Sequence, residues 1–154
     1  MLRRRALAFV VVASLATASG SARAQANGAD THFKHGVELY KDNDYSAALV
    51  EFRRAYELDP RFQVLYNIAE AYFQLQDYAN ALRTFQKYLN EGATKIPAAR
   101  RAEVEKELEK LKKRVARLEV VTSEPGVAIS VDDVPVGSTP LDEALLVSAG
   151  RRKV

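Results

Sequence analysis

Residues 35–60, HGVELYKDNDYSAALVEFRRAYELDP, and residues 68–93, IAEAYFQLQDYANALRTFQKYLNEGA, are two copies of one pattern. In each copy, apolar residues at helical spacing stand on both sides of a short polar break. The matched positions share a constant offset of 33 residues: Gly36 with Ala69, Leu39 with Tyr72, Asp44-Tyr45 with Asp77-Tyr78, Ala48 with Ala81, Leu49 with Leu82, and Phe52 with Phe85. A constant offset of this length predicts two stacked helical hairpins.

Both copies resemble the tetratricopeptide repeat, a helical hairpin with small and aromatic residues at fixed positions. The residues that carry the resemblance are Gly36, Leu39, Ala48, Phe52, Ala55 and Pro60 in the first copy, and Ala69, Tyr72, Ala81 and Phe85 in the second. The second copy departs from the family pattern at Tyr88 and Ala93, where Ala and Pro are usual. The resemblance predicts two repeats, at about residues 29–60 and 62–93.

An apolar stripe follows the repeats in residues 97–118, PAARRAEVEKELEKLKKRVARL. Pro97 suits the first turn of a helix, and steps of four and three residues place the apolar side chains on one face. These side chains are Val104, Leu108, Leu111, Val115 and Leu118. Two repeats are fewer than the roughly three that stacking normally needs, so we expect this helix to cap the second repeat. A seam between two copies of the chain is the alternative use of the stripe.

The pattern changes to short strands after Leu118. LEVVTS is β-branched, VAISVD alternates apolar with small or polar residues, and Pro125-Gly126 and Asp132-Asp133 mark turns. The stretches SEPGV at 123–127 and VGSTPL at 136–141 resemble a PEGA domain, a small β module of exported and surface-associated proteins. The resemblance implies a partial, β-sandwich-like module over residues 118–154, and therefore an α+β fold for the whole chain.

The PEGA resemblance stops before the family's final strand and closing turn, because the sequence ends at Arg151-Arg152-Lys153-Val154. A β module this short rarely folds without further support. We therefore expect a truncated module, with a module that borrows a strand from a partner as the alternative.

Residues 1–26 have the features of a secretory signal peptide: three arginines, an apolar run, and small residues that offer cleavage after Ala24 or Ala26. The apolar run is shorter than the roughly 20 residues that a membrane-spanning helix needs. We therefore expect a periplasmic or secreted mature protein that does not span the membrane, with an uncleaved N-terminal anchor as the alternative.

The net charge of the chain changes once this leader is set aside. The leader holds four of the 23 basic residues and none of the 20 acidic ones, so the rest of the chain has a net charge of −1. This charge gives no support for a nucleic-acid partner. The lack of cysteine excludes disulfides and thiolate metal sites.

Few residues suggest chemistry. His32, His35 and Glu38 follow one another at three-residue steps on one predicted helix, a spacing that could serve a zinc-dependent hydrolase. The two histidines coincide with packing positions of the repeat, so we interpret them as structural. Asp132 and Asp133 are neighbours in an extended stretch, where side chains point to opposite faces, so we interpret them as a turn and not as a catalytic pair. We expect neither catalytic residues, a metal site nor a cofactor.

The tetratricopeptide resemblance implies a binding role, since these repeats typically hold extended segments of partner proteins on a concave face. The first helix of each hairpin lines that face. The lining positions are Phe33, Val37, Tyr40, Lys41, Tyr66, Asn67, Glu70, Phe73 and Gln74. Four of them are aromatic and would form a patch of the kind that anchors interfaces, or would pack between the helices instead.

These observations predict an exported, non-enzymatic scaffold protein of the cell envelope. The repeats would bind a protein or peptide partner, and the PEGA module would contact another envelope component such as the cell wall or the surface layer. That last role rests on family association alone. The alternative is a structural homo-oligomer, in the simplest case a homodimer, assembled through residues 97–118.

Overall fold

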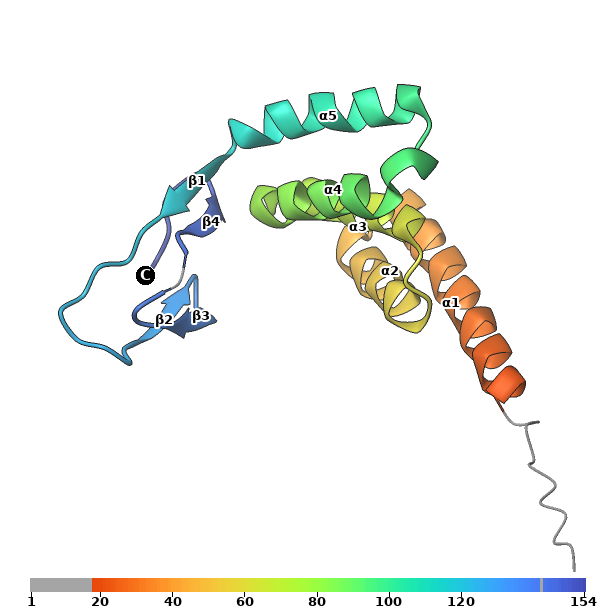
Figure 1. The fold of residues 1–154 in the computed structure, drawn as a ribbon, viewed down its shortest axis with the longest axis horizontal. Coiled ribbons are helices and arrows are strands. Elements are labelled where there is room, and N and C mark those ends of the chain that lie inside the picture. The colour runs from red at the N-terminus through yellow and green to blue at the C-terminus, as the bar shows by residue number, and fades with distance from the viewer. Residues whose placement is uncertain (1–17, 142) are drawn as a thin grey trace, which may run out of the picture.

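The computed structural model describes residues 18–141 and 143–154. Five α-helices come first and four short β-strands follow (Figure 1). The helices are α1 (Ala18–Lys41), α2 (Tyr45–Leu58), α3 (Phe62–Gln74), α4 (Tyr78–Gly92) and α5 (Ala98–Lys112). The strands are β1 (Val115–Leu118), β2 (Ala128–Val131), β3 (Val134–Ser138) and β4 (Leu145–Ser148). The predicted α+β class is confirmed.

The predicted signal peptide, residues 1–26, lies largely outside the described residues, because the description begins at Ala18. Helix α1 runs through both predicted cleavage positions, Ala24 and Ala26. In the described part of the chain, no helix has the length and apolar character needed to cross a membrane.

Two helical hairpins, α1 with α2 and α3 with α4, repeat one another down to the backbone of their turns. Asn43 and Gln76, 33 residues apart in the sequence, both have positive φ, 64° and 60°. The residue after each begins the second helix of its hairpin as an N-cap. The carboxylates of Asp44 and Asp77 accept hydrogen bonds from the backbone N–H three residues on, at 3.1 and 3.2 Å. An N-cap of this kind is a local device, so each aspartate sets the start of its helix without help from the rest of the fold.

The hairpins pack closely because small residues stand where their helices meet. A Cβ atom added at Gly36 would lie 2.8 Å from the ring of Phe52, so only glycine allows α1 to approach α2 this closely. Ala69, the equivalent residue of the second hairpin, is fully buried, as are Phe52 and its counterpart Phe85. These side chains belong to one hydrophobic core that runs from α1 to α5.

Helix α5 covers α4 and closes the core, but it ends at Lys112 and not at Leu118, where the apolar spacing predicted its end. Val104, Leu108 and Leu111 are buried against the repeats, with 1, 7 and 0% of their surface exposed. The chain then turns into β1, because β4 supplies an antiparallel backbone partner for Val115–Leu118. That partner lies far along the sequence, so the local pattern could not reveal the strand.

The β-rich region holds two antiparallel pairs, β1 with β4 and β2 with β3. The predicted turn at Asp132-Asp133 is present between β2 and β3, and both residues have positive φ, 50° and 65°. Two successive residues of positive φ are what a tight type I′ hairpin needs. A backbone hydrogen bond holds the C-terminal residues against this hairpin: the Asp132 N–H donates to the Lys153 carbonyl at 2.9 Å.

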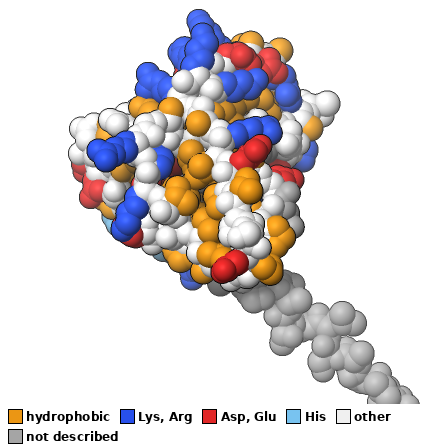
Figure 2. Space-filling view, turned by 90° about the vertical axis from the view of Figure 1, so that its left-hand side faces the viewer, with side chains coloured by type: hydrophobic (Ala, Val, Ile, Leu, Met, Phe, Trp, Pro, Cys, Tyr) orange, Lys and Arg blue, Asp and Glu red, His pale blue; other side chains and the backbone are white. Residues whose placement is uncertain are grey.

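The β-rich region is attached to the beginning of α4. The N–H of Ala79 donates to the Ser148 hydroxyl at 3.2 Å, and Arg83 donates to the carbonyl of Leu146 at 2.7 Å. Figure 2 shows the face of the molecule that lies on the left in Figure 1. Hydrophobic side chains gather near the middle of this face, with Lys and Arg side chains around them. Val121, Val154 and Val134 are strongly exposed apolar residues of the β-rich region, at 91, 63 and 62%.

Candidate interaction groove

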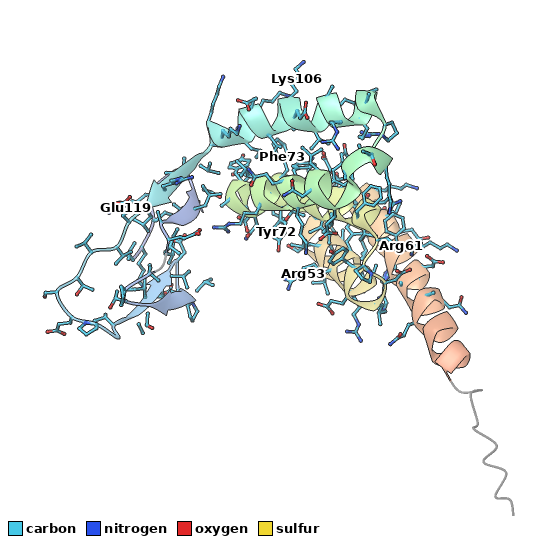
Figure 3. The ribbon with its side chains drawn as sticks, in the orientation of Figure 1. Arg53, Arg61, Tyr72, Phe73, Lys106 and Glu119 are labelled. Atoms are coloured by element: carbon cyan, nitrogen blue, oxygen red, sulfur yellow. The ribbon has the colours of Figure 1, made fainter. Side chains whose placement is uncertain are left out.

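A groove of about 640 Å³ lies between α3 and α5, over α4. Tyr66, Glu70 and Phe73 of α3 form one wall, and Phe85 of α4 contributes to the base. The other wall comes from α5 and the residue just beyond it: Glu103, Val104, Lys106, Glu107, Lys110 and Arg114. Figure 3 shows Phe73 in the space between the α3–α4 hairpin and α5.

The four aromatic residues predicted to line the concave face are held by partner rings from the second helix of the same hairpin. The four pairs are Phe33 with Phe52, Tyr66 with Phe85, Tyr40 with Tyr45, and Phe73 with Tyr78, with ring centroids 5.7, 5.7, 5.1 and 5.8 Å apart. The two hairpins thus contain the same two pairs at the same offset. All four predicted rings are half-buried, so each packs between helices on one side and reaches the surface on the other. The rings therefore pack between the helices and leave part of their surface exposed, and their role as interface anchors stays a prediction.

The structure brings only some of the predicted lining residues into this groove. Tyr66, Glu70 and Phe73 line it, whereas Phe33 lines a separate hollow of about 270 Å³ between α1 and the start of α3. The remaining predicted residues are placed outside the groove walls. Tyr40, Val37 and Asn67 are half-buried on α1 and α3, and Lys41 and Gln74 are exposed at the ends of those helices.

Burial and neighbouring charges change the pKa of three groups on this face. Burial raises the pKa of Glu70, a hydrogen bond with Tyr66 lowers it, and the carboxylate of Glu107 raises it further. Burial, and then the charge of Glu70, raise the pKa of the Tyr66 hydroxyl. Burial likewise raises the pKa of Tyr40, although a hydrogen bond with Gln74 opposes the shift. The carboxylate of Glu107 on α5 therefore acts on Glu70, and the charge of Glu70 in turn raises the pKa of Tyr66 and of Tyr40.

Two arginines from the ends of α5 lie against aromatic rings of the repeats. The guanidinium of Arg100 is 4.9 Å from the ring centre of Tyr66 and donates to its hydroxyl at 3.3 Å. The guanidinium of Arg114 is 5.8 Å from the ring centre of Phe73, and it donates to the Tyr78 hydroxyl at 2.7 Å. These contacts fix both ends of α5 over the α3–α4 hairpin.

A tetratricopeptide repeat model matches residues 62–90. The matched span contains all of α3 and most of α4, which form the hairpin that carries one groove wall. Repeats of this kind are generally non-enzymatic, and they indicate a protein that serves as a scaffold for other proteins. The comparison shows no PEGA domain for the C-terminal region, and no curated protein matches the chain.

Sequence reasoning missed the wall that α5 adds to the α3–α4 hairpin. Glu103, Lys106, Glu107 and Lys110 of that wall remain partly or fully exposed. A signal was present in the sequence, because Glu103 and Glu107 stand directly before the buried Val104 and Leu108. Residues next to a buried stripe lie at its edge, where they meet the neighbouring helix.

The apolar stripe of residues 97–118, which could have joined two copies of the chain, divides into two parts in the structure. Its first three residues, Val104, Leu108 and Leu111, fill the chain's own core, as a cap on the α3–α4 hairpin would. Val115 and Leu118 are half-buried in β1. The first part is thus covered within a single chain, and the observed packing does not favour a helical seam.

The histidines form a contact between α1 and α2. Nδ1 of His32 is 2.6 Å from one carboxylate oxygen of Glu51, and Nδ1 of His35 is 3.5 Å from the other. Glu38, the third residue of the sequence pattern, is exposed. Among the described residues, His, Cys, Asp and Glu side chains form no group of three or more that could hold a metal ion.

Proposed function

We propose that this protein is an exported, non-enzymatic scaffold of the cell envelope that binds an extended segment of a partner protein in the groove between α3 and α5. The observation that carries the proposal is the groove itself, in a hairpin that matches a tetratricopeptide repeat. Its walls combine half-exposed aromatic rings with charged side chains. Aromatic residues in partly desolvated pockets provide most of the energy at protein interfaces.

The rigidity of the groove supports this role. Phe73 and Tyr66 rest on rings of α4, and Arg100 and Arg114 hold α5 opposite them. A pre-organised surface loses less conformational entropy on binding than a mobile one. A partner segment would therefore meet side chains that already stand in place.

The test is site-specific photo-crosslinking in cells that produce the full chain. A photo-reactive residue is placed at Lys106, an exposed position on the groove wall, and in a separate variant at Asn90, an exposed position of α4 that does not line the groove. We expect one discrete protein adduct from position 106 and none from position 90. Adducts of equal yield at both positions, or none at position 106, would overturn the groove as the binding surface.

Export is tested by the mass of the protein recovered from the cell envelope or the medium. We expect the intact mass to correspond to a chain that lacks its first 24 or 26 residues, because the small residues there suit signal peptidase. A full-length chain in the cytoplasm would contradict export.

The C-terminal strands support a second contact, through their resemblance to a PEGA domain. Exposed apolar residues such as Val121 and Val134 would form part of that surface. We expect the protein to sediment with purified cell wall, and we expect Val134→Asp to weaken this association. No sedimentation of the unaltered protein would remove the cell wall as the target, and unchanged sedimentation of the variant would remove Val134 from the contact surface.

A further inference from the structure

Glu70 differs from the other acidic residues of the groove in having no ion-pair partner among the described residues. The carboxylate of Glu103 pairs with Arg100 at 2.8 Å, and that of Glu107 pairs with Lys110 at 2.5 Å. Glu70 is half-buried on α3, between Tyr66 and Phe73 on the same groove wall. The groove therefore contains one acidic group that forms no ion pair with another described residue.

The surroundings of Glu70 make its charge unfavourable in the free protein. Burial disfavours the charged form, and the carboxylate of Glu107 adds repulsion. Arg100 gives only partial relief, because its guanidinium is engaged with Glu103 and with the face of Tyr66. A cation supplied from outside the chain would find a desolvated carboxylate with free hydrogen-bonding capacity.

The rings beside Glu70 are suited to the same cation. Lysine and arginine side chains bind over aromatic rings through the electrostatic attraction of the ring face. The protein already uses this contact at the ends of the groove, where Arg100 lies over Tyr66 and Arg114 lies near Phe73. A long basic side chain can also place its apolar stem along such rings while its charged head reaches the carboxylate.

Resting on the proposed binding role of the groove, we infer that it recognises one lysine or arginine side chain in the bound segment, with the cationic head at the Glu70 carboxylate and the stem beside Tyr66 and Phe73.

The positive charges at the two ends of the groove limit which residues can flank that basic residue in the bound segment. Arg100 stands at one end, and Lys110 and Arg114 stand at the other. Further cations in the segment would meet these groups and be repelled. The occupant is therefore a segment of a partner protein with a single basic residue among apolar or acidic neighbours, and a polybasic tract binds less well.

The experiment selects peptides from a randomised phage-displayed library on the full chain and measures the affinity of the winning peptides by fluorescence anisotropy. We expect the winners to share one lysine or arginine. Replacing that residue by glutamine weakens binding about tenfold, as the loss of a partly exposed ion pair and a cation–π contact would. Glu70→Gln weakens binding of the original peptide to the same extent, and the two changes together cost no more than either alone.

Two further variants separate recognition from general charge effects. Glu70→Lys should reverse the preference, so that selection on this variant enriches aspartate or glutamate at the same place. Glu105→Gln is the matched control, because Glu105 is an exposed residue of α5 that does not line the groove. It should leave affinity unchanged. Circular dichroism of each variant confirms that it is folded before binding is measured.

The outcomes distinguish this inference from the function on which it rests. Peptides that bind in the groove without a shared basic residue, or whose affinity does not respond to Glu70→Gln, overturn the inference and leave the binding role in place. A library that yields no peptide competing for the groove overturns both.

Discussion

Leu111→Ala tests whether α5 caps the hydrophobic core of its own chain. The side chain is fully buried in the last turn of α5, where it joins the core formed with the repeats. The substitution removes every carbon beyond Cβ from a closely packed site. Losing the burial of a leucine side chain costs about 2 kcal/mol, and the unfilled space adds to that cost.

The site has little freedom to collapse around the smaller side chain. Arg100 holds the beginning of α5 against Tyr66, and Arg114 holds the chain just beyond its end against Tyr78. Because α5 cannot move inward at either end, we expect most of the cavity to persist. The free energy of unfolding should therefore fall by about 3 kcal/mol. Such a loss is a large part of the stability of an ordinary domain.

The assay is urea denaturation followed by far-UV circular dichroism at two protein concentrations about tenfold apart. We expect the midpoint of the unaltered protein to be independent of concentration, as for a helix that caps its own chain. The control is Val50→Ala on α2, where the side chain is 66% exposed; it should change the free energy of unfolding by less than about 0.5 kcal/mol.

Two results would refute this reasoning. A loss below about 1 kcal/mol would mean that Leu111 is not packed as described. A midpoint that rises with concentration, together with a Leu111→Ala variant that is a folded monomer by light scattering, would mean that the stripe joins two copies of the chain and does not cap one.

Three further predictions concern local features of the α3–α4 hairpin. Asp77→Ala removes the N-cap of α4 and should lower the free energy of unfolding by about 1 kcal/mol, measured by urea denaturation. Gln76→Gly should raise it by about 0.5 kcal/mol because Gln76 has positive φ, whereas Gln74→Gly in the last turn of α3 should lower it. The same sign for both changes would contradict the turn geometry. Glu70→Gln should stabilise the protein at neutral pH, because burial raises the pKa of Glu70 in the folded state and so penalises its charge. This stability advantage of the variant should shrink as the pH falls toward the ordinary pKa of 4.5, because the folded protein takes up the Glu70 proton before the unfolded chain does. Thermal unfolding at a series of pH values measures the advantage. An advantage that grows on acidification would contradict the raised pKa.

Local sequence patterns predicted the hairpins well, because the interactions that define them lie close together in the chain. Asp44 and Asp77 cap their helices through the backbone three residues on. The 33-residue offset paired Gly36 with Ala69, both of which are buried in the structure, and the ring pairs recur at the same offset. Each of these features depends on residues within one repeat, so both repeats form the same local structure.

The groove was predicted only in part, because its second wall comes from a segment outside the repeats. Glu70 and Phe73 were expected on the lining face, but their environment depends on α5. The charge on Glu107 and the arginines at the ends of α5 reach them only after that helix folds back over α4. Periodicity predicted a buried stripe on α5 and could not say which side chains would stand opposite its edges.

The sequence by itself determined the repeats, their turns and the helix starts, because capping and helical periodicity are encoded within a few neighbouring residues. The tertiary structure alone decided where α5 gives way to β1, since the ladder that holds Val115–Leu118 is supplied by Leu145–Ser148. It alone also decided that Glu70 is a half-buried carboxylate without an ion pair in the described chain, because burial and charge balance arise only when distant helices pack against one another.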